Sequence, residues 1–329
     1  MEDVIDLLEC GSEQNALAVM LHGFGGMGKT TLAEAIFLVI DIEEYKYSMV
    51  QLFKNVGSTP VIIELQRSIL KDLMGSENMI PDIRKYQDGQ RALGRVFEQV
   101  PALIYIDNVL GEDELQHLLP NNMNKAKKLR LLLTARDLKV RKGIRKIRTE
   151  VYSMKGLPDT AAMLLLEKEM YSPGDDKEEE IDSSQLNQII KVCGGIPKLL
   201  EVVAGFMRSE EDPQKAYHTL MKEREKWNGL KIRDIDTYFF AYNCLHEELK
   251  DAFLDICSFF EGWDWDTVEN IVGESELDML KSRALITRDI NGVASVHDVI
   301  LTIGRQKAQR MRFKFSSASQ IIELLDEKV

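Results

Sequence analysis

The chain has 329 residues, of which 44% are hydrophobic, and a formal net charge of −12 at pH 7. This length suits two or three domains with ordinary globular cores. The acidic balance disfavours nucleic acid as a partner, because contacts with phosphates need a positive surface.

The composition also disfavours a membrane or secreted protein. No run of 18 apolar residues occurs, and the N-terminal segment MEDVIDLLECGSEQ is acidic where a signal peptide would be basic and then apolar. The four cysteines, Cys10, Cys193, Cys244 and Cys257, show no metal-ligand spacing. We therefore interpret them as reduced residues and expect a cytoplasmic protein without a membrane partner.

One segment departs from the acidic balance. Between Lys125 and Arg148 basic residues far outnumber acids, and Asp137 is the only acid. A solvated surface near a phosphate-binding edge and a nucleic-acid patch are both compatible with this pattern, and we favour the first.

The first half of the chain alternates two kinds of segment. Residues 16–21, 47–53, 102–107 and 129–134 are apolar on both faces, which predicts buried strands, whereas residues 31–40, 61–74 and 88–100 have apolar residues at helical spacing. Strands alternating with helices indicate a parallel sheet that is covered on both faces. We therefore predict an α/β domain with a doubly wound sheet over residues 1–154.

The pattern changes after about residue 155. Residues 155–228 are mainly helical, and residues 229–313 combine short helices with two β-rich pieces around an Asn291-Gly292 turn. This predicts a helical domain followed by a winged-helix domain, with residues 314–329 beginning a linker. We expect the aromatic residues Phe253, Phe259, Phe260, Trp263 and Trp265 to belong to the winged-helix core.

The segment GFGGMGKTT at 23–31 fits the pattern G-x-x-x-x-G-K-[ST] and lies between a predicted strand and a predicted helix. Its glycines let backbone amides turn inward, where they can hold phosphate oxygens at a helix N-terminus. Lys29 would reach the β- and γ-phosphates, and the Thr30 hydroxyl would bind Mg²⁺. The sequence thus predicts a P-loop nucleotide site formed by Gly23, Gly25, Gly26, Met27, Gly28, Lys29, Thr30 and Thr31.

Polar residues follow two of the predicted strands. Asp107 ends a strand at the same sheet edge, so we expect it to share Mg²⁺ with Thr30. Asn108 follows where nucleotide hydrolases commonly carry a second acid; an amide can orient water but cannot accept its proton. As a catalytic residue Asn108 is therefore a weak candidate, and slow or absent hydrolysis is expected. Arg136, just after the next strand, can pair with phosphate oxygens and is a candidate sensor of the γ-phosphate.

These residues belong to a series of ordered motifs. They are GFGGMGKTT, FKNV at 53–56 with LQRSIL, LIYIDNV at 103–109, LLLTARD at 131–137, CGGIPKLL at 193–200, FLDICSFFEG at 253–262 and VHDVILTIGRQ at 296–306. The series resembles the NB-ARC nucleotide-binding switch of plant NLR intracellular immune receptors, and is more similar to the branch linked to TIR domains.

The resemblance implies a switch that binds ADP or ATP with Mg²⁺. In it Pro197 packs on the adenine, His297 reaches the β-phosphate of ADP, and Asp298 orients the winged-helix loop. ADP holds the resting state, and exchange for ATP leads to self-association. The resemblance also implies other domains of the same receptor, an N-terminal signalling domain and leucine-rich repeats, outside this sequence.

Some positions differ from the family pattern, namely Asn108, Ala135, Lys198 and Val296. Two alternatives to the switch stay open. One is a P-loop ATPase whose turnover is itself the output. The other is a nucleotide-regulated DNA-binding protein that uses the winged helix, with the basic residues Arg305, Lys307, Arg310 and Arg312 in the segment 296–313.

Overall fold

The computed structural model describes residues 1–9, 16–40, 44–52, 59–76, 80–171, 181–226 and 238–311. The chain divides into two compact units, Met1–Lys155 and Gly156–Val329. Cys10, the FKNV motif, the expected boundary near residue 228 and the expected linker from 314 lie outside the described residues.

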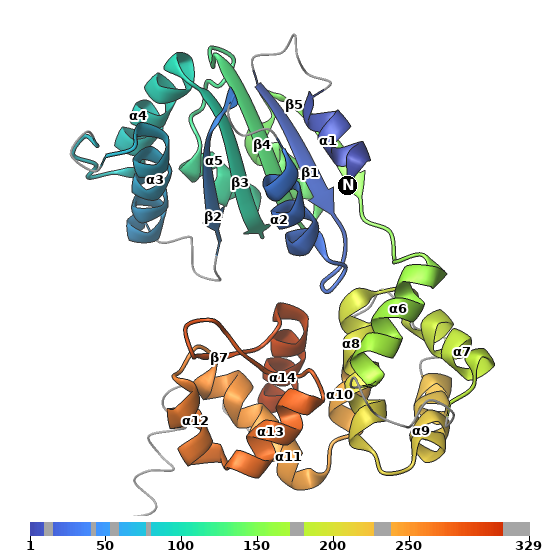
Figure 1. Ribbon diagram of the computed structural model, residues 1–329. Helices are drawn as coiled ribbons and strands as arrows, with labels where there is room; N and C mark the ends of the chain where they lie inside the picture. The colour runs from blue at the N-terminus through green and yellow to red at the C-terminus, as the bar shows by residue number, and fades with distance from the viewer. Residues whose placement is uncertain are drawn as a thin grey trace, which may run out of the picture. The chain divides into compact units, whose positions relative to one another are not determined.

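The first unit is built on a five-stranded sheet in the order β2-β3-β4-β1-β5, and all its neighbouring strands are parallel. Figure 1 shows this sheet with helices in front and behind. The strands are β1 (Ala16–His22), β2 (Lys46–Gln51), β3 (Pro101–Val109), β4 (Lys128–Ala135) and β5 (Arg148–Ser153).

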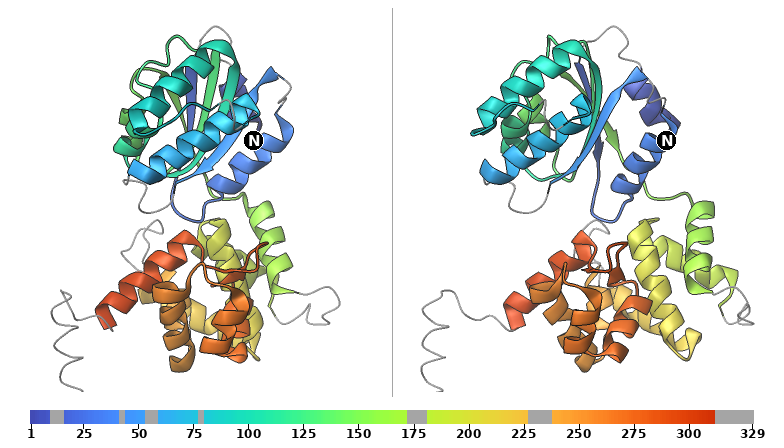
Figure 2. Two further views of the ribbon diagram at one scale, coloured as in Figure 1. Left: turned by 90° about the vertical axis from the view of Figure 1, so that its left-hand side faces the viewer. Right: turned by 60° about the vertical axis from the view of Figure 1, so that its left-hand side comes forward.

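Helices cover both faces of the sheet, as the right-hand view of Figure 2 shows most clearly. One face packs against α1 (Glu2–Glu9) and α2 (Lys29–Val39). The other packs against α3 (Thr59–Met74), α4 (Tyr86–Gln99), α5 (Glu112–Leu118) and the 3₁₀ helix η3 (Leu138–Ile144). Successive residues of β3 alternate between the two cores, with Ile104 on one side and Leu103 and Tyr105 on the other. This explains why the central strands are apolar on both faces.

Four elements of this unit, α1, α5, η3 and β5, were not predicted from the sequence, and the reason is clearest for β5 and α1. β5 is an edge strand that pairs only with β1 among the described strands, so its residues RTEVYS are half-exposed and show no buried-strand pattern. Helix α1 is short, and its buried residues Val4 and Leu8 were not recognised as a helical stripe. Both errors arise because a short, partly exposed element carries little hydrophobic signal.

The second unit begins with four helices, α6 (Asp159–Met170), α7 (Ser183–Cys193), α8 (Pro197–Ser209) and α9 (Pro213–Lys226). Local sequence explains their ends. Asp182 caps α7 by accepting a hydrogen bond from the Gln185 amide, Gly194 ends α7 in the left-handed conformation, and Pro197 occupies the first turn of α8.

Short helices and a hairpin follow, as predicted. The helices are α10 (Phe239–Asn243), α11 (Glu247–Asp255), the π-helical turn η5 (Ile256–Phe260), α12 (Trp265–Val272), α13 (Glu274–Ser282) and α14 (Asp298–Met311). Strands β6 (Thr287–Arg288) and β7 (Ala294–Ser295) form the antiparallel hairpin around the predicted Asn291-Gly292 turn. The predicted fold class is therefore confirmed.

One prediction about the core was partly wrong. Phe253 and Trp265 are buried, but Phe259 and Trp263 are 52% and 48% exposed. These two rings contact Phe260, with centroid distances of 6.1 and 5.3 Å, so they form a surface cluster at the C-terminal end of η5, which contains Phe259 and Phe260. None of the helices in the described ranges has the length and hydrophobicity that a bilayer-spanning segment requires.

Candidate functional site at the phosphate loop

The loop between β1 and α2 has the backbone that its glycines predict. Gly26 and Gly28 have φ angles of 80° and 81°, in the left-handed region where a side chain adds strain. Gly23 is held closely as well, because a Cβ there would lie 3.0 Å from the Met154 Cβ. The loop leads directly into α2 at Lys29, so the first amides of that helix face the loop, where an anion is favoured.

Lys29 lies over this loop. Its Nζ donates hydrogen bonds to the carbonyl oxygens of Gly23 at 2.8 Å and Phe24 at 2.6 Å. The ammonium group is thus positioned at the mouth of the loop, where a bound phosphate would meet it.

The next residue, Thr30, contacts Asp107 at the end of β3, as the sequence predicted. Its Oγ1 donates to the Asp107 carboxylate, 3.1 Å from Oδ1 and 3.2 Å from Oδ2. The hydroxyl of Thr134 on β4 also donates to Asp107 Oδ1. Two hydroxyls therefore orient one buried carboxylate at the edge of the sheet. A hydroxyl and a carboxylate are the ligand types that Mg²⁺ takes beside nucleotide phosphates.

Tyr105 and Thr134 are site residues that the sequence analysis missed. The Tyr105 hydroxyl is buried without a hydrogen-bond partner among the described residues. Burial, followed by the charge of Asp107, raises the pKa of this phenol, so it stays protonated. Alternation along β3 gave a hint, because Tyr105 and Asp107 are two residues apart and share one face of the strand.

Asn108 sits in a bulge of β3, where the register with β4 shifts between Ile106 and Val109. Its φ angle is 59°, a left-handed conformation that Asn tolerates better than most residues. Its Nδ2 donates to the Leu52 carbonyl at 3.1 Å, and its backbone amide donates to Thr134 Oγ1 at 2.8 Å. The structure thus shows a conformational reason for Asn at this position, while its expected effect on water stays a prediction.

The remaining predicted residues of the first unit lie close by in the chain. Arg136 directly follows β4 and is half-buried, and Met27 and Thr31 flank the start of α2, with Thr31 exposed. Their assignment to the nucleotide stays a prediction.

Pro197 and His297 belong to the second unit. The glycines before Pro197 pack against the start of this unit: a Cβ on Gly195 would lie 2.6 Å from the Leu157 carbonyl oxygen, and the Leu157 amide donates to the Gly195 carbonyl at 2.8 Å. His297 precedes α14, and its Nδ1 accepts a hydrogen bond of 3.3 Å from the Val299 amide. The proton of a neutral imidazole then lies on Nε2, as a donor to a phosphate would require.

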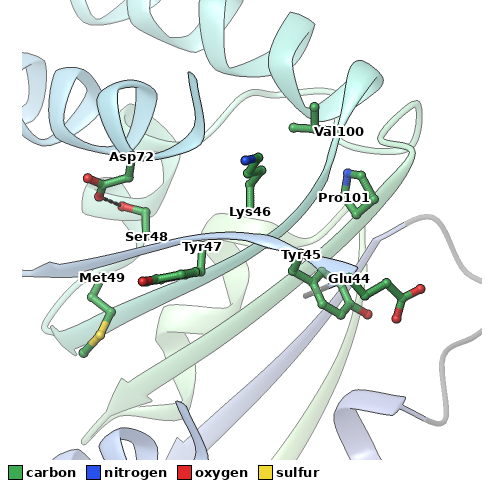
Figure 3. Close-up of a pocket in the computed structure, with 9 residues that line it drawn as sticks. All are labelled: Glu44, Tyr45, Lys46, Tyr47, Ser48, Met49, Asp72, Val100 and Pro101. Atoms are coloured by element: carbon green, nitrogen blue, oxygen red, sulfur yellow. Dashed lines mark hydrogen bonds between the residues drawn. The ribbon is translucent and has the colours of Figure 1, made fainter. Parts of the chain in front are cut away.

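A large hollow lies elsewhere in the first unit. It measures about 770 Å³ and runs along the outer strand β2 and the start of β3 (Figure 3). Ser48 donates there to Asp72 at 2.6 Å, whereas Tyr47 and Met49 project from the other side of β2. The hollow contains no residue of the phosphate loop, so its size does not make it the nucleotide site.

The sheet, the glycine loop and the Thr30–Asp107 pair define a nucleotide-binding protein of the P-loop class. The profile of the NB-ARC domain family matches residues 1–175, which is more than half of the chain. The chain belongs to this family.

Curated relatives agree with this assignment. Disease resistance protein RUN1 of Vitis rotundifolia is 24% identical over 292 residues, which cover 87% of this chain and 21% of that protein. TMV resistance protein N of Nicotiana glutinosa is 21% identical over 342 residues, which cover 99% of this chain and 29% of that protein. The chain therefore spans less than a third of the length of either relative.

A solved structure shares the fold. A signal transduction ATPase with numerous domains, a protein with a tetratricopeptide repeat sensor from Pyrococcus horikoshii, matches 93% of this chain and 42% of its own chain. The TM-score is 0.58 at 16% identity, which shows a common fold and no more.

Proposed function

We propose that this chain is the ADP/ATP-dependent switch of a plant disease-resistance receptor. The observation that carries the proposal is the Thr30–Asp107 contact of 3.1 Å beside a glycine loop at the start of α2. Membership of the NB-ARC family and similarity to disease resistance proteins of plants support it.

Each residue has a proposed role at the nucleotide. The loop amides and Lys29 bind the phosphates, Thr30 and Asp107 hold Mg²⁺, and Arg136 senses the γ-phosphate. Mg²⁺ would supply charge neutralisation at the phosphates. Pro197 would pack on the adenine, and His297 would donate from Nε2 to the β-phosphate of ADP.

The switch follows from differential affinity. A nucleotide shifts a conformational equilibrium only as far as it contacts the two states differently. In the proposal His297 contacts ADP in the resting state, and exchange for ATP releases the winged-helix domain and permits self-association. Asn108 makes hydrolysis slow, because its amide cannot take a proton from water. The three described cysteines are free thiols, which fits the proposed cytoplasmic location.

The first test identifies the resident nucleotide. The purified chain and its Lys29→Arg variant are denatured, and the released nucleotide is quantified by chromatography. We expect nearly one ADP per chain, absent from the variant. If neither protein releases nucleotide and neither binds added ADP, the proposal fails.

Three further measurements test separate parts of the proposal. His297→Ala should weaken ADP binding more than ATP binding, since the proposed contact is made in the ADP state. Equal losses of affinity for the two nucleotides would contradict that contact. Light scattering should show larger particles with ATP than with ADP. A rapid steady-state ATPase that Lys29→Arg abolishes would contradict slow hydrolysis and favour turnover as the output.

A further inference from the structure

A second polar hollow lies in the first unit, between the C-terminal end of α5 and the end of η3, with a volume of about 250 Å³. Its rim carries three cationic side chains, Lys142, Arg145 and Lys146, and two side-chain amides, Gln116 and Asn121. Its apolar lining comes from Leu119, Met123 and Ile144, which are buried. Cations and amide donors around an apolar floor are the composition of a small-molecule site for an anion.

This hollow lies at the opposite end of the sheet from the phosphate loop. Residues 119–127 lead into the start of β4, and the end of η3 leads into the start of β5. The phosphate loop instead follows the end of β1, and all these strands are parallel. Since β4 has eight residues, the two sites are separated by roughly 25 Å along the strands.

Two buried glutamines fix the α5 side of the hollow. Gln90 Nε2 donates to the carbonyl oxygens of Gln116 at 2.6 Å and Leu119 at 2.8 Å, and Gln66 Nε2 donates to those of His117 and Leu118. Free carbonyls at a helix C-terminus repel anions. Here all four carbonyl oxygens accept hydrogen bonds from neutral side-chain amides. This wall is therefore rigid and repels an anion less strongly than free carbonyl groups would.

On the η3 side of the hollow, Gly143 packs closely against α5. A Cβ at this position would lie 2.5 Å from the Glu112 carbonyl oxygen and 2.9 Å from the Leu115 Cβ. Only glycine allows this close approach, and Val140 and Ile144 bury the rest of the contact. The two walls therefore form a preorganised site, which lowers the entropy cost of binding.

The cations on the rim are available to a ligand. Within the described ranges, the side chains of Lys142 and Lys146 make no ion pair, and Arg145 approaches Glu112 only at 4.0 Å with 68% of its side chain exposed. Residues 125–148 contain eleven basic residues and one acid, in a chain whose net charge is −12. This segment thus provides a local positive potential on an acidic protein.

We infer that this hollow is a second anion site, which binds a compact ligand carrying clustered phosphate groups. Arg145 can engage one phosphate through two parallel hydrogen bonds, and the lysines act as point charges for further phosphates. Gln116 and Asn121 can donate to the remaining oxygens. Such phosphates occur on soluble polyphosphorylated molecules and on the headgroups of phosphorylated lipids.

The test uses the full chain with saturating ADP and Mg²⁺, so that the phosphate loop is filled, and repeats the measurement in Lys29→Arg. Calorimetry at 0.15 M salt measures binding of tripolyphosphate and of inositol hexakisphosphate. Sedimentation measures binding to phosphatidylcholine vesicles with and without a phosphoinositide bisphosphate. We expect one site per chain that is unaffected by Lys29→Arg. Soluble probes binding alone would assign a soluble ligand, and vesicle binding would assign a lipid headgroup.

A matched pair of variants locates the site. The triple change Lys142→Gln, Arg145→Gln and Lys146→Gln should weaken binding about tenfold or more, equivalent to at least one charge-assisted hydrogen bond. The control Lys125→Gln, Lys127→Gln and Lys139→Gln removes the same charge from exposed residues of the same segment that do not line the hollow. Equal loss in both triples would indicate diffuse charge attraction and overturn the inference. So would failure of the parent chain to bind any of these probes.

Discussion

The Thr30 hydroxyl lies 3.1 Å from the Asp107 carboxylate, although 77 residues separate the two in the chain. The contact arises because β1 and β3 run parallel and end at the same edge of the sheet. It is the arrangement expected of two neighbouring ligands of one Mg²⁺ ion.

Replacing Asp107 by Asn should therefore weaken Mg²⁺-dependent nucleotide binding by at least about tenfold, because the proposed metal ligand loses its charge. Affinity for a fluorescent ATP analogue is measured with Mg²⁺ and with EDTA. The difference between the variant and the parent should disappear in EDTA. Asp113→Asn makes the same charge change at an exposed residue of α5 and should leave both affinities unchanged. An equal loss with and without Mg²⁺ would show that Asp107 supports the fold alone.

Asn108 provides a conformational test at the neighbouring position. Both Asn108→Gly and Asn108→Ala remove the hydrogen bond to the Leu52 carbonyl, but only alanine places a Cβ in the left-handed region. The free energy of unfolding of the alanine variant should be about 1 kcal/mol lower than that of the glycine variant, as expected for this backbone conformation. Chemical denaturation of the two variants gives the difference. Equal stability would mean that the bulge relaxes to an ordinary strand.

The central strands and the phosphate loop could be predicted because their signals are local. β3 and β4 are buried on both faces, so each contains a run of consecutive apolar residues, and the loop glycines with Lys29 and Thr30 form a contiguous motif. β5 could not be predicted, because a half-exposed edge strand needs little apolar surface.

Parts of the site escaped prediction for a different reason. The contact of Thr134 with Asp107, and that of Asn108 with Leu52, depend on strand order and on a register shift in β3. No local pattern encodes which strands become neighbours. Sequence spacing therefore predicted the glycine loop and the pairing of Thr30 with Asp107, but not the contact of Thr134 with the same carboxylate.

The buried thiols predict how stability depends on pH. Burial raises the pKa values of Cys193 and Cys257 above the usual 9.0, with Arg305 partly offsetting the effect at Cys257. Below pH 9 the thiols are protonated in both the folded and unfolded states and add no pH dependence. Above it only the unfolded state loses protons, so the free energy of unfolding should fall by about 1.4 kcal/mol per pH unit for each thiol.

The double variant Cys193→Ala and Cys257→Ala checks this dependence. It should be less stable at neutral pH because it leaves cavities, but its stability should fall less steeply between pH 9 and 10.5. Denaturation curves across that range give the slope, which is the informative quantity. An unchanged slope would mean that other groups account for the alkaline loss.

Replacement by alanine should change the free energy of unfolding in opposite directions at two helical glycines. Gly205 on α8 packs against the end of α13, where a Cβ would lie 2.7 Å from the Arg283 carbonyl carbon and from the Ser282 oxygen. Gly94 on α4 has room, since a Cβ there would meet Pro120 at 3.7 Å. In both helices alanine is intrinsically favoured by roughly 0.5–1 kcal/mol, so only the surroundings decide the sign.

Gly94→Ala should therefore stabilise the first unit by about that amount. Gly205→Ala should destabilise the second by about 1–3 kcal/mol, because α8 and α13 must move apart. That movement would also disturb the nearby ion pair of 2.9 Å between Arg283, whose side chain is only 4% exposed, and Glu210. Hydrogen exchange separates the two units and should show faster exchange in α8 and α13 for Gly205→Ala alone. If Gly205→Ala instead stabilises the chain, these helices are not in the tight contact described here.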